Sequence, residues 1–283
     1  MLRIAIPNKG SLSAPASEML REAGYRQRAD SRELVVVDHN AGVEFFFLRP
    51  RDIAIYVGSG KLDIGITGRD LLLDSDAAAV EVLTLGFSYS TFRFARVPGA
   101  VWGVEDLADK TIATAYPGVV AKYLAERGVQ PGHLVRLDGA VETSLKLGVA
   151  DCIADVVETG GTLRALGLEV FGEPIMSSEA IVVRPAAAGA ASDAEEKFLR
   201  RLRGVLVARR YVMMDYDIPA EQVESAVALT PGLESPTVSP LHREGWVAVR
   251  AMVLAEEAQN IMDQLERVGA RAILTTSIHA CRI

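Results

Sequence analysis

IADVVETGGTLRALGL, residues 153–168, passes from an apolar run to a glycine turn and then to a helical pattern. The apolar residues around Asp155 favour a buried strand, and this acid stands where the strand would open onto solvent. Gly160 and Gly161 allow the backbone to turn tightly. The leucines that follow have the spacing of a helix start. A strand, a tight turn and a helix form the repeating unit of α/β proteins, so this stretch predicts that fold class.

The turn also has the chemistry of an anion site. Several backbone N–H groups and the hydroxyls of Thr159 and Thr162 would point to one place, at the positive end of a helix dipole. A carboxylate beside such a cradle, here Asp155, suits the ribose of a sugar phosphate or a bound Mg²⁺. The alternative is a structural turn that binds nothing, because glycine-rich turns occur throughout α/β proteins.

Length and composition limit the class of protein. The chain has 283 residues, of which 49% are hydrophobic and 24% charged, which predicts two or three domains at about 100–200 residues each. No apolar run approaches the ~20 residues of a membrane helix, and the first residues lack the features of a signal peptide. Cys152 and Cys281 are expected to be reduced thiols in a cytoplasmic protein. The net charge of −7 argues against nucleic-acid binding but not against small polyanions.

Strands and helices alternate along the first two thirds of the chain. Strands are expected at residues 2–6, 33–38, 43–49, 63–67, 110–116, 133–139 and from 153 onward. Helices are expected from residue 11 or 13 to about 23, at 51–59, after Gly68, at 119–128 and at 141–150. This alternation predicts a parallel sheet with helices on both faces. An Ala/Gly-rich loop at 185–196 precedes an amphipathic helix of about 15 residues.

The last part of the chain, residues 211–283, has a different rhythm. Strands are expected at 211–216, 235–241, 246–253 and 271–283, and helices at 219–229 and 255–269. The order βαββαβ is that of a ferredoxin-like module. Such modules commonly bind effectors, an inference by analogy.

Three cationic residues follow predicted strands. Lys9 lies in PNKGSL after the first strand, and Arg49 and Arg51 lie in LRPRD after the third. Ligands of open α/β sheets bind beyond the carboxyl ends of strands, and guanidinium groups bind phosphate through two hydrogen bonds. The alternatives are a solvated loop lysine for Lys9 and a helix-start ion pair with Asp52 for the arginines.

Other strand ends offer Gly68 and Asp70 in GITGRD, and Tyr116 in ATAYPG, which could stack on a base or simply pack. The four histidines are scattered, and no nucleophilic triad, CxxC, HExxH, GxxxxGK[ST] or GxGxxG pattern occurs. Any metal is therefore expected to be Mg²⁺ brought in by phosphates.

Five motifs in order give a specific resemblance: PNKGSL, EFFFLRPRDIAIYVGSGKLDIGITGRDLL, ATAYP, DGAVE and ADVVETGGTL. Together they resemble ATP phosphoribosyltransferase, the first enzyme of histidine biosynthesis, over essentially the whole chain. The βαββαβ tail is similar to the long, histidine-regulated form. The common phosphoribosyltransferase signature has two adjacent acids, where this chain has Ala154 and Asp155. That departure favours the family with a periplasmic-binding-protein-like core over the nucleotide-salvage enzymes.

The resemblance implies an α/β fold with a two-lobed, type II periplasmic-binding-protein-like catalytic core and a ferredoxin-like regulatory domain. Residues 1–90 and 183–205 would form one lobe, 91–182 the second, and 211–283 the regulatory domain. It also implies a hexamer built from dimers, inhibition by histidine and inhibition by AMP.

The resemblance also implies site residues. The 5-phosphate of phosphoribosyl pyrophosphate would bind Glu158, Thr159, Gly160, Gly161 and Thr162. The ribose or its Mg²⁺ would face Asp155 and Glu142. Pyrophosphate and ATP would be received by catalytic Lys9 and Arg49 and by ATP-binding Gly68, Asp70 and Tyr116. Histidine would bind Asp217, Leu233, Thr237 and Ala272, between tails of neighbouring subunits; alternatively, Asp217 caps the helix that begins near Pro219.

The expected reaction needs alignment and charge neutralisation rather than a strong nucleophile. Adenine N1 attacks C1 of the ribose as pyrophosphate leaves, through a transition state that resembles an oxocarbenium ion. Two other classes stay open: a solute-binding protein with the same two-lobed core, and a non-catalytic regulatory paralogue. Release of pyrophosphate from ATP and phosphoribosyl pyrophosphate distinguishes the enzyme from both.

Overall fold

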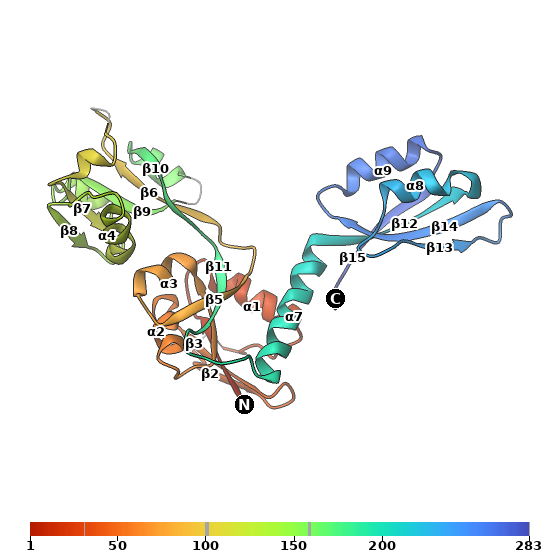
Figure 1. Ribbon diagram of the computed structural model, residues 1–283, viewed down its shortest axis with the longest axis horizontal. Coiled ribbons are helices and arrows are strands. Elements are labelled where there is room, and N and C mark those ends of the chain that lie inside the picture. Colours follow the sequence, from red (N-terminus) through yellow and green to blue (C-terminus); the bar gives the residue numbers. More distant parts are fainter. Residues whose placement is uncertain (31, 100–101, 158–159, 283) are drawn as a thin grey trace. The chain divides into compact units, whose positions relative to one another are not determined.

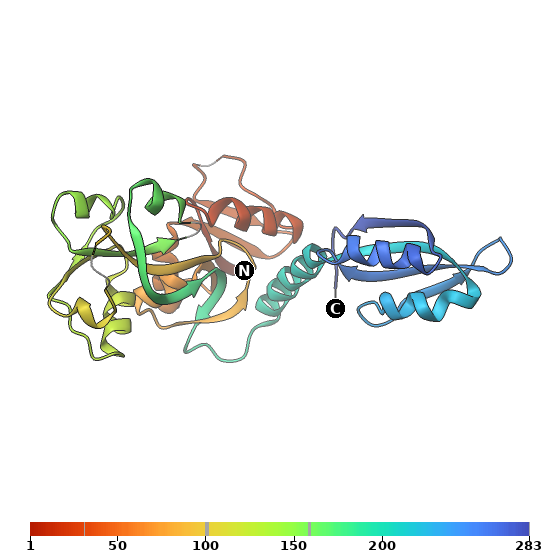
Figure 2. The same cartoon turned by 90° about the horizontal axis from the view of Figure 1, so that it is seen from above.

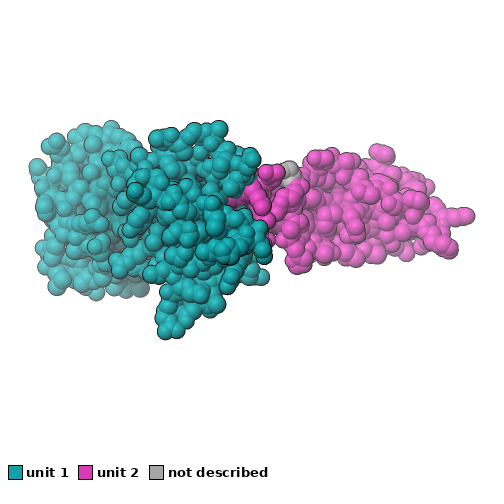
Figure 3. All heavy atoms as spheres, turned by 90° about the horizontal axis from the view of Figure 1, so that it is seen from below, with its two compact units in different colours: residues 1–21, 25–196 teal, residues 22–24, 197–283 magenta. Residues whose placement is uncertain are grey.

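The computed structural model describes residues 1–30, 32–99, 102–157 and 160–282. The chain forms two compact units, coloured separately in Figure 3. The first comprises Met1–Arg21 and Tyr25–Glu196, and the second comprises Glu22–Gly24 and Lys197–Ile283. Within the described residues, the first unit holds two sheets and the second holds one. No helix of this described part combines the length and the hydropathy that a bilayer crossing requires.

The first sheet has the order β2-β3-β1-β4-β11-β5. Its strands are β1 (Leu2–Pro7), β2 (Val35–Asp38), β3 (Val43–Leu48), β4 (Ile64–Gly68), β5 (Ala79–Thr84) and β11 (Ala180–Pro185). Its helices are α1 (Ser13–Glu22), α2 (Pro50–Gly58) and α3 (Arg69–Ser75). The central strands are largely apolar because both faces of the sheet are covered, and Ile4, Ile6 and Ile64 are fully buried. Helix α2 begins at Pro50, a residue that suits the first helical position.

The second sheet has the order β10-β6-β9-β7-β8. Its strands are β6 (Ser90–Arg96), β7 (Thr111–Thr114), β8 (His133–Arg136), β9 (Cys152–Val157) and β10 (Glu169–Ser178). Its helices are α4 (Pro117–Ala125), α5 (Thr143–Lys146) and α6 (Gly161–Ala165). Val120 and Leu124 of α4 pack on one face of the sheet. Val141 and Leu163 pack on the other, beside Ile153.

Both sheets share one topology. Apart from the edge strand β2, the orders β3-β1-β4-β11-β5 and β8-β7-β9-β6-β10 correspond position by position. In each sheet the fourth strand enters from the other sheet and runs antiparallel to its neighbours. The chain therefore crosses between the sheets twice, at residues 85–89 and at Glu179 (Figure 1). This is the two-lobed, type II periplasmic-binding-protein-like fold.

The prediction of a purely parallel sheet is wrong. Strand β11 runs antiparallel to β4 and β5, and β6 runs antiparallel to β9 and β10. The alternation of strands and helices indicates which neighbours are parallel. It does not reveal that β11 returns to the first sheet after the second is complete, or that β6, the first strand after the crossing, lies between β9 and β10.

The second unit contains most of helix α7 (Asp193–Arg210) and a βαββαβ module, seen end to end in Figure 2. Its elements are β12 (Tyr211–Pro219), α8 (Val223–Leu229), β13 (Thr237–Pro240), β14 (Trp246–Leu254), α9 (Ala258–Arg267) and β15 (Arg271–Ser277). The strand order β13-β14-β12-β15 is antiparallel throughout. This confirms the ferredoxin-like prediction. Tyr216 and Leu265 are central to the core between sheet and helices.

Several predicted boundaries differ from the structure. The helix expected at 219–229 is a 3₁₀ turn, Ala220–Gln222, followed by α8, a common form of a helix start. The helix expected at 141–150 is the single turn α5, and Gly148 beyond it adopts a left-handed conformation. The last strand ends at Ser277 rather than at residue 283.

Candidate active site

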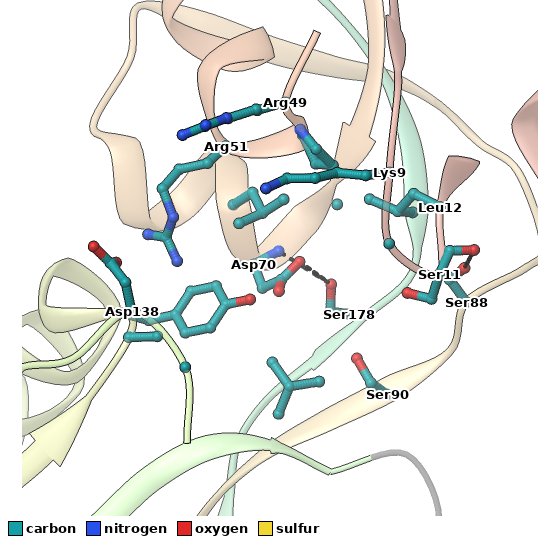
Figure 4. Close-up of a pocket in the computed structure, with 18 of the residues that line it drawn as sticks. Lys9, Ser11, Leu12, Arg49, Arg51, Asp70, Ser88, Ser90, Asp138 and Ser178 are labelled. Carbon is teal, nitrogen blue, oxygen red and sulfur yellow. Dashed lines mark hydrogen bonds between the residues drawn. The ribbon is translucent and has the colours of Figure 1, made fainter. Parts of the chain in front are cut away.

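A cavity of about 730 Å³ lies where strand ends of the two sheets face each other (Figure 4). Its wall includes residues that follow β1, β3, β4, β7 and β8 at their carboxyl ends, the position at which ligands of open α/β sheets bind. Six residues that the sequence singles out line it together: Lys9, Arg49, Arg51, Gly68, Asp70 and Tyr116. They come from four separate strand ends, so the fold brings them together.

The cationic side of the cavity is formed by Lys9, Arg49 and Arg51, which extend into the same space in Figure 4. Arg49 has an extended backbone because Pro50 follows it. Among the described residues, neither Lys9 nor Arg49 has an ion-pair partner. Two exposed cations that face a cavity without a protein counter-ion are suited to an anionic ligand.

The sequence offers two roles for Arg51, binding of a phosphate or an ion pair with Asp52. The structure shows a third arrangement. Its guanidinium pairs with Asp74 of α3 at 2.8 Å, not with Asp52. Its guanidinium carbon lies 4.8 Å from the centroid of the Tyr116 ring, within cation–π range. Sequence reasoning missed Asp74, because nothing local to α3 indicates that its partner follows β3.

Asp70 is a buried carboxylate fixed from several sides. Its Oδ1 accepts a hydrogen bond from the Ser178 hydroxyl at 2.8 Å, and its backbone N–H donates to the same hydroxyl oxygen at 3.1 Å. A Cβ at Gly68 would collide with this carboxylate, so the glycine leaves the space that Asp70 occupies. Burial raises the pKa of Tyr116, and the charge of Asp70 and its hydrogen bond to the phenol act in the same direction.

The predicted phosphate loop lies at the carboxyl end of β9. Glu158 and Thr159 fall outside the described residues. Gly160 adopts a left-handed conformation with φ +69° and precedes α6, which contains Gly161 and Thr162. The cavity wall reaches Val156 on this strand but does not include Gly160, Gly161 or Thr162.

Asp155 lies in an acidic environment. Burial raises the pKa of its carboxyl, and the charges of Glu142 and Asp70 raise it further. The hydrogen bond from the Val156 N–H, at 2.8 Å, acts in the opposite direction. The charges of two carboxylates from other elements, Glu142 and Asp70, therefore act on Asp155. This is an arrangement that a cation would stabilise.

Asp155 and Glu142 are the candidate ligands for Mg²⁺. In the part of the chain that the structure describes, there is no group of three or more His, Cys, Asp or Glu side chains placed to hold a metal ion. Mg²⁺ commonly binds one or two carboxylates together with substrate phosphates and water. Asp155 and Glu142 supply carboxylates of that kind, and the charge of Glu142 acts on Asp155.

Several cavity residues were not singled out from the sequence. They lie in the turn after β1, at or beside the two crossovers, and at the end of β8, and they are Ser11, Ser88, Ser90, Arg136, Asp138 and Ser178. Ser88 has a left-handed backbone, φ +54°, and its hydroxyl donates to the carbonyl of Ser11 at 3.2 Å. Asp138 belongs to the DGAVE motif and Ser11 to the PNKGSL motif, so the sequence offered a signal for both, whereas Ser88, Ser90 and Ser178 belong to none of the five motifs.

The predicted effector residues lie on the sheet of the second unit or beside it. Asp217 on β12 pairs with Arg271 of β15, just beyond a shift in register, and Ala272 next to it has φ +51°. Thr237 lies on β13, at the opposite edge of the sheet, and Leu233 precedes that strand. Within one chain the four residues do not form a single pocket.

The capping alternative for Asp217 is wrong. The residues that immediately precede the 3₁₀ turn and α8 are Pro219 and Gln222, so Asp217 is not at the N-cap position of either.

Comparisons with known proteins agree with the motifs. Residues 49–204 match a family model described as ATP phosphoribosyltransferase, and residues 208–280 match one described as HisG, C-terminal domain. The chain is 69% identical to "ATP phosphoribosyltransferase" of Streptomyces avermitilis over 286 residues, which cover 100% of both chains. It is 63% identical to the protein of the same name in Paenarthrobacter aurescens over 287 residues, again with full coverage of both.

A solved structure is also similar. It is described as the "ATP phosphoribosyl transferase (HisG:HisZ) complex from Thermotoga maritima" and is 28% identical to this chain, with a TM-score of 0.63. The match covers 73% of this chain and 98% of the other.

Proposed function

This chain belongs to the ATP phosphoribosyltransferase family, and we propose that its two substrates meet in the cavity between the two sheets of the first unit. The chain is an enzyme of histidine biosynthesis. It transfers the phosphoribosyl group of phosphoribosyl pyrophosphate to N1 of the adenine of ATP, giving N1-(5-phosphoribosyl)-ATP and pyrophosphate.

The observation that carries this proposal is the convergence of Lys9 and Arg49 on one cavity with Asp70 and Tyr116. Both substrates are polyphosphates, and cations without protein partners suit them. The cavity lies beyond the carboxyl ends of parallel strands, where such ligands bind.

The chemistry assigns a role to the cations. As the bond from C1 to pyrophosphate breaks, negative charge grows on the leaving oxygen and positive charge on the ribose. Lys9 and Arg49 neutralise the leaving pyrophosphate, which stabilises the transition state more than the ground state. Adenine N1 attacks as a neutral nitrogen, so the protein must align it with C1 rather than deprotonate it.

Three further residues of the cavity, Tyr116, Asp70 and Gly68, position ATP. Tyr116 keeps its proton, since its pKa lies above the ordinary value for tyrosine, and it presents both a ring face and a hydroxyl. Asp70 is a fixed acceptor because the Ser178 hydroxyl holds it. Gly68 allows this packing at the start of α3.

The ribose phosphate is assigned to the second lobe. Gly160, Gly161 and Thr162, with Glu158 and Thr159 before them, bind the 5-phosphate. Asp155 and Glu142 face the ribose hydroxyls or hold Mg²⁺, and phosphoribosyltransferases generally use a divalent metal. When bound, Mg²⁺ supplies positive charge that offsets the charge of pyrophosphate. The supporting observation is that the charge of Glu142 acts on Asp155 and raises its pKa.

Several finer properties belong to the same proposal. Histidine inhibits the enzyme by binding Asp217, Leu233, Thr237 and Ala272 between tails of neighbouring subunits, and AMP inhibits it as well. The chains form dimers that assemble into a hexamer in the cytoplasm. The lobes are residues 1–90 with 183–205, and 91–182; the regulatory domain is 211–283. Support comes from the match of residues 208–280 to the C-terminal family model and from the separation of Asp217 and Thr237 onto different strands.

The test is an assay for pyrophosphate. The purified chain should release pyrophosphate when ATP, phosphoribosyl pyrophosphate and Mg²⁺ are all present, and not when either substrate is omitted. Binding of either substrate without release of pyrophosphate would instead support a solute-binding or purely regulatory protein.

A further inference from the structure

Asp74 of α3 joins groups from both lobes. Its side chain is 8% exposed, and its Oδ2 accepts a hydrogen bond from Nη1 of Arg51, in its own lobe, at 2.8 Å. Its Oδ1 accepts from the backbone N–H of Gly118 at 2.9 Å and lies 3.4 Å from that of Val119, both in the first turn of α4. Asp74 is absent from the cavity wall, so any effect it has on substrates passes through these groups.

Helix α4 has no cap of its own. Its N-cap residue is Tyr116, which makes no capping hydrogen bond with its side chain. A cap normally comes from a Ser, Thr, Asp or Asn at this position, whose oxygen accepts from the N–H of the second or third helical residue. Gly118 and Val119 are those residues, and Asp74 of the other lobe supplies the oxygen. The N-cap position is thereby left to an aromatic residue that lines the cavity.

Gly118 is fitted to this contact. A Cβ there would lie 2.7 Å from the backbone carbonyl oxygen of Asp74 and 3.2 Å from its Oδ1. Its φ is not in the left-handed range, so the backbone conformation itself does not require glycine. What requires glycine is the close approach of α3 to α4.

Asp74 therefore holds Tyr116 from two directions. Through Arg51 it fixes a guanidinium 4.8 Å from the centroid of the Tyr116 ring. Through the first turn of α4 it fixes the backbone that follows Tyr116. The charge of Asp70 also acts on the phenol of this tyrosine and raises its pKa.

We propose that Asp74 is a positioning residue: by capping α4 from the opposite lobe and pairing with Arg51, it sets the arrangement of Tyr116 and Arg51 in which ATP is bound for transfer. This rests on the proposed function, in which Tyr116 lies on the ATP side of the cavity. The phosphate loop at α6 is a separate element, so the effect should fall on ATP and not on phosphoribosyl pyrophosphate.

The test compares Asp74→Asn with Asp63→Asn. Asp63 is a matched control because its carboxylate also accepts from one guanidinium and one backbone N–H, both of Arg3, but away from the cavity. Asp74→Asn should lower kcat/KM for ATP by about tenfold to about a hundredfold, since a misplacement of about 1 Å has effects of that order. KM for ATP should rise, KM for phosphoribosyl pyrophosphate should stay within about twofold of the wild-type value, and Asp63→Asn should retain wild-type kinetics.

A second variant separates position from charge. Gly118→Ala keeps every charge and adds a good helix former, but it forces α3 and α4 apart. The steric conflict should lower the unfolding midpoint, and the protein that remains folded should show the same rise in KM for ATP. A merely structural role would lower kcat through a smaller folded fraction and leave both KM values unchanged.

Two results would overturn the proposal. One is wild-type KM for ATP in both Asp74→Asn and Gly118→Ala. The other is a defect in Asp74→Asn that only follows loss of folded protein, with Gly118→Ala fully active. A wild-type chain that releases no pyrophosphate would instead contradict the proposed function, which keeps the two failures distinct.

Discussion

Ser178 and Asp70 are hydrogen-bonded at 2.8 Å across 108 positions of sequence, at the point where the chain returns from the second sheet to the first. Both residues are buried, with exposures of 5% and 8%. Asp70 also faces the cavity, so one hydrogen bond links the crossover of the fold to the proposed ATP site.

Ser178→Ala should therefore reduce both stability and ATP affinity. Removal of the hydroxyl leaves a buried carboxylate oxygen without its partner, which costs about 1–3 kcal/mol. Chemical denaturation and calorimetric titration with ATP measure the two effects. Ser177→Ala is the control, because Ser177 is exposed and precedes the same crossover. Equal stability and equal ATP affinity of the two variants would show that the contact between Ser178 and Asp70 contributes to neither.

Lys9→Ala should lower turnover more than it weakens ATP binding. Lys9 is proposed to meet charge that develops as pyrophosphate leaves, and loss of such a group reduces kcat by about a hundredfold or more. Steady-state kinetics and the dissociation constant of ATP separate the two quantities. A loss confined to substrate affinity, with kcat intact, would indicate simple anchoring.

Changes in the phosphate loop should weaken phosphoribosyl pyrophosphate binding. Thr162→Ala removes a hydroxyl donor to a charged group, an effect of about 1.5–3 kcal/mol. Gly160→Val should be worse, since valine is strained at φ +69° and its side chain blocks close approach of the ligand. Calorimetry with phosphoribosyl pyrophosphate provides the measurement. Unchanged affinity in both variants would remove the loop from the site.

Asp155→Asn should make the free protein more stable at neutral pH and weaken phosphoribosyl pyrophosphate binding. Burial and the charges of Glu142 and Asp70 raise the folded-state pKa of Asp155. The folded state then binds the proton more tightly than the unfolded chain does. This contribution to stability is fully present below the ordinary pKa and is lost as the pH rises through the raised one.

The stabilisation by asparagine should accordingly shrink as the pH falls through the raised pKa, and ligand affinity of the wild type should decline over the same interval. Thermal unfolding across pH, without and with phosphoribosyl pyrophosphate and Mg²⁺, measures both. A less stable Asn variant with unchanged affinity is the contrary result.

Asp217→Ala should stay active and lose inhibition by histidine. The variant removes the carboxylate proposed to pair with a charged nitrogen of free histidine, and couplings of this kind are typically about 1–3 kcal/mol. Activity at increasing histidine concentration is the measurement. Full inhibition of the variant would place the effector site elsewhere.

The sequence predicts where strands end better than it predicts which strands are neighbours in a sheet. Lys9, Arg49, Asp70 and Tyr116 each follow a recognisable strand, and the rule that ligands bind at carboxyl ends of strands brings them together correctly. The antiparallel strands β6 and β11 could not be predicted in this way, because their neighbours are set by chain crossings and not by local periodicity.

The contacts of Asp74 could not be predicted from the sequence either. Its partners, Arg51 and the first turn of α4, are distant in sequence and belong to other elements. A helix cap is predicted from the residues next to the start of the helix. The residue that caps α4 is Asp74 of the other lobe, which lies far away in the sequence. By contrast, the βαββαβ order of the tail is local and was predicted correctly.

The most direct test of the central claim is to observe the new bond. ATP labelled with ¹⁵N at N1 and phosphoribosyl pyrophosphate labelled with ¹³C at C1 of the ribose are incubated with the chain and Mg²⁺ and followed by NMR. The account predicts a one-bond ¹³C–¹⁵N coupling that grows as pyrophosphate is released, and much slower growth with the Lys9→Ala, Arg49→Ala double variant. Pyrophosphate release without this coupling, or an undiminished rate in the double variant, would contradict it.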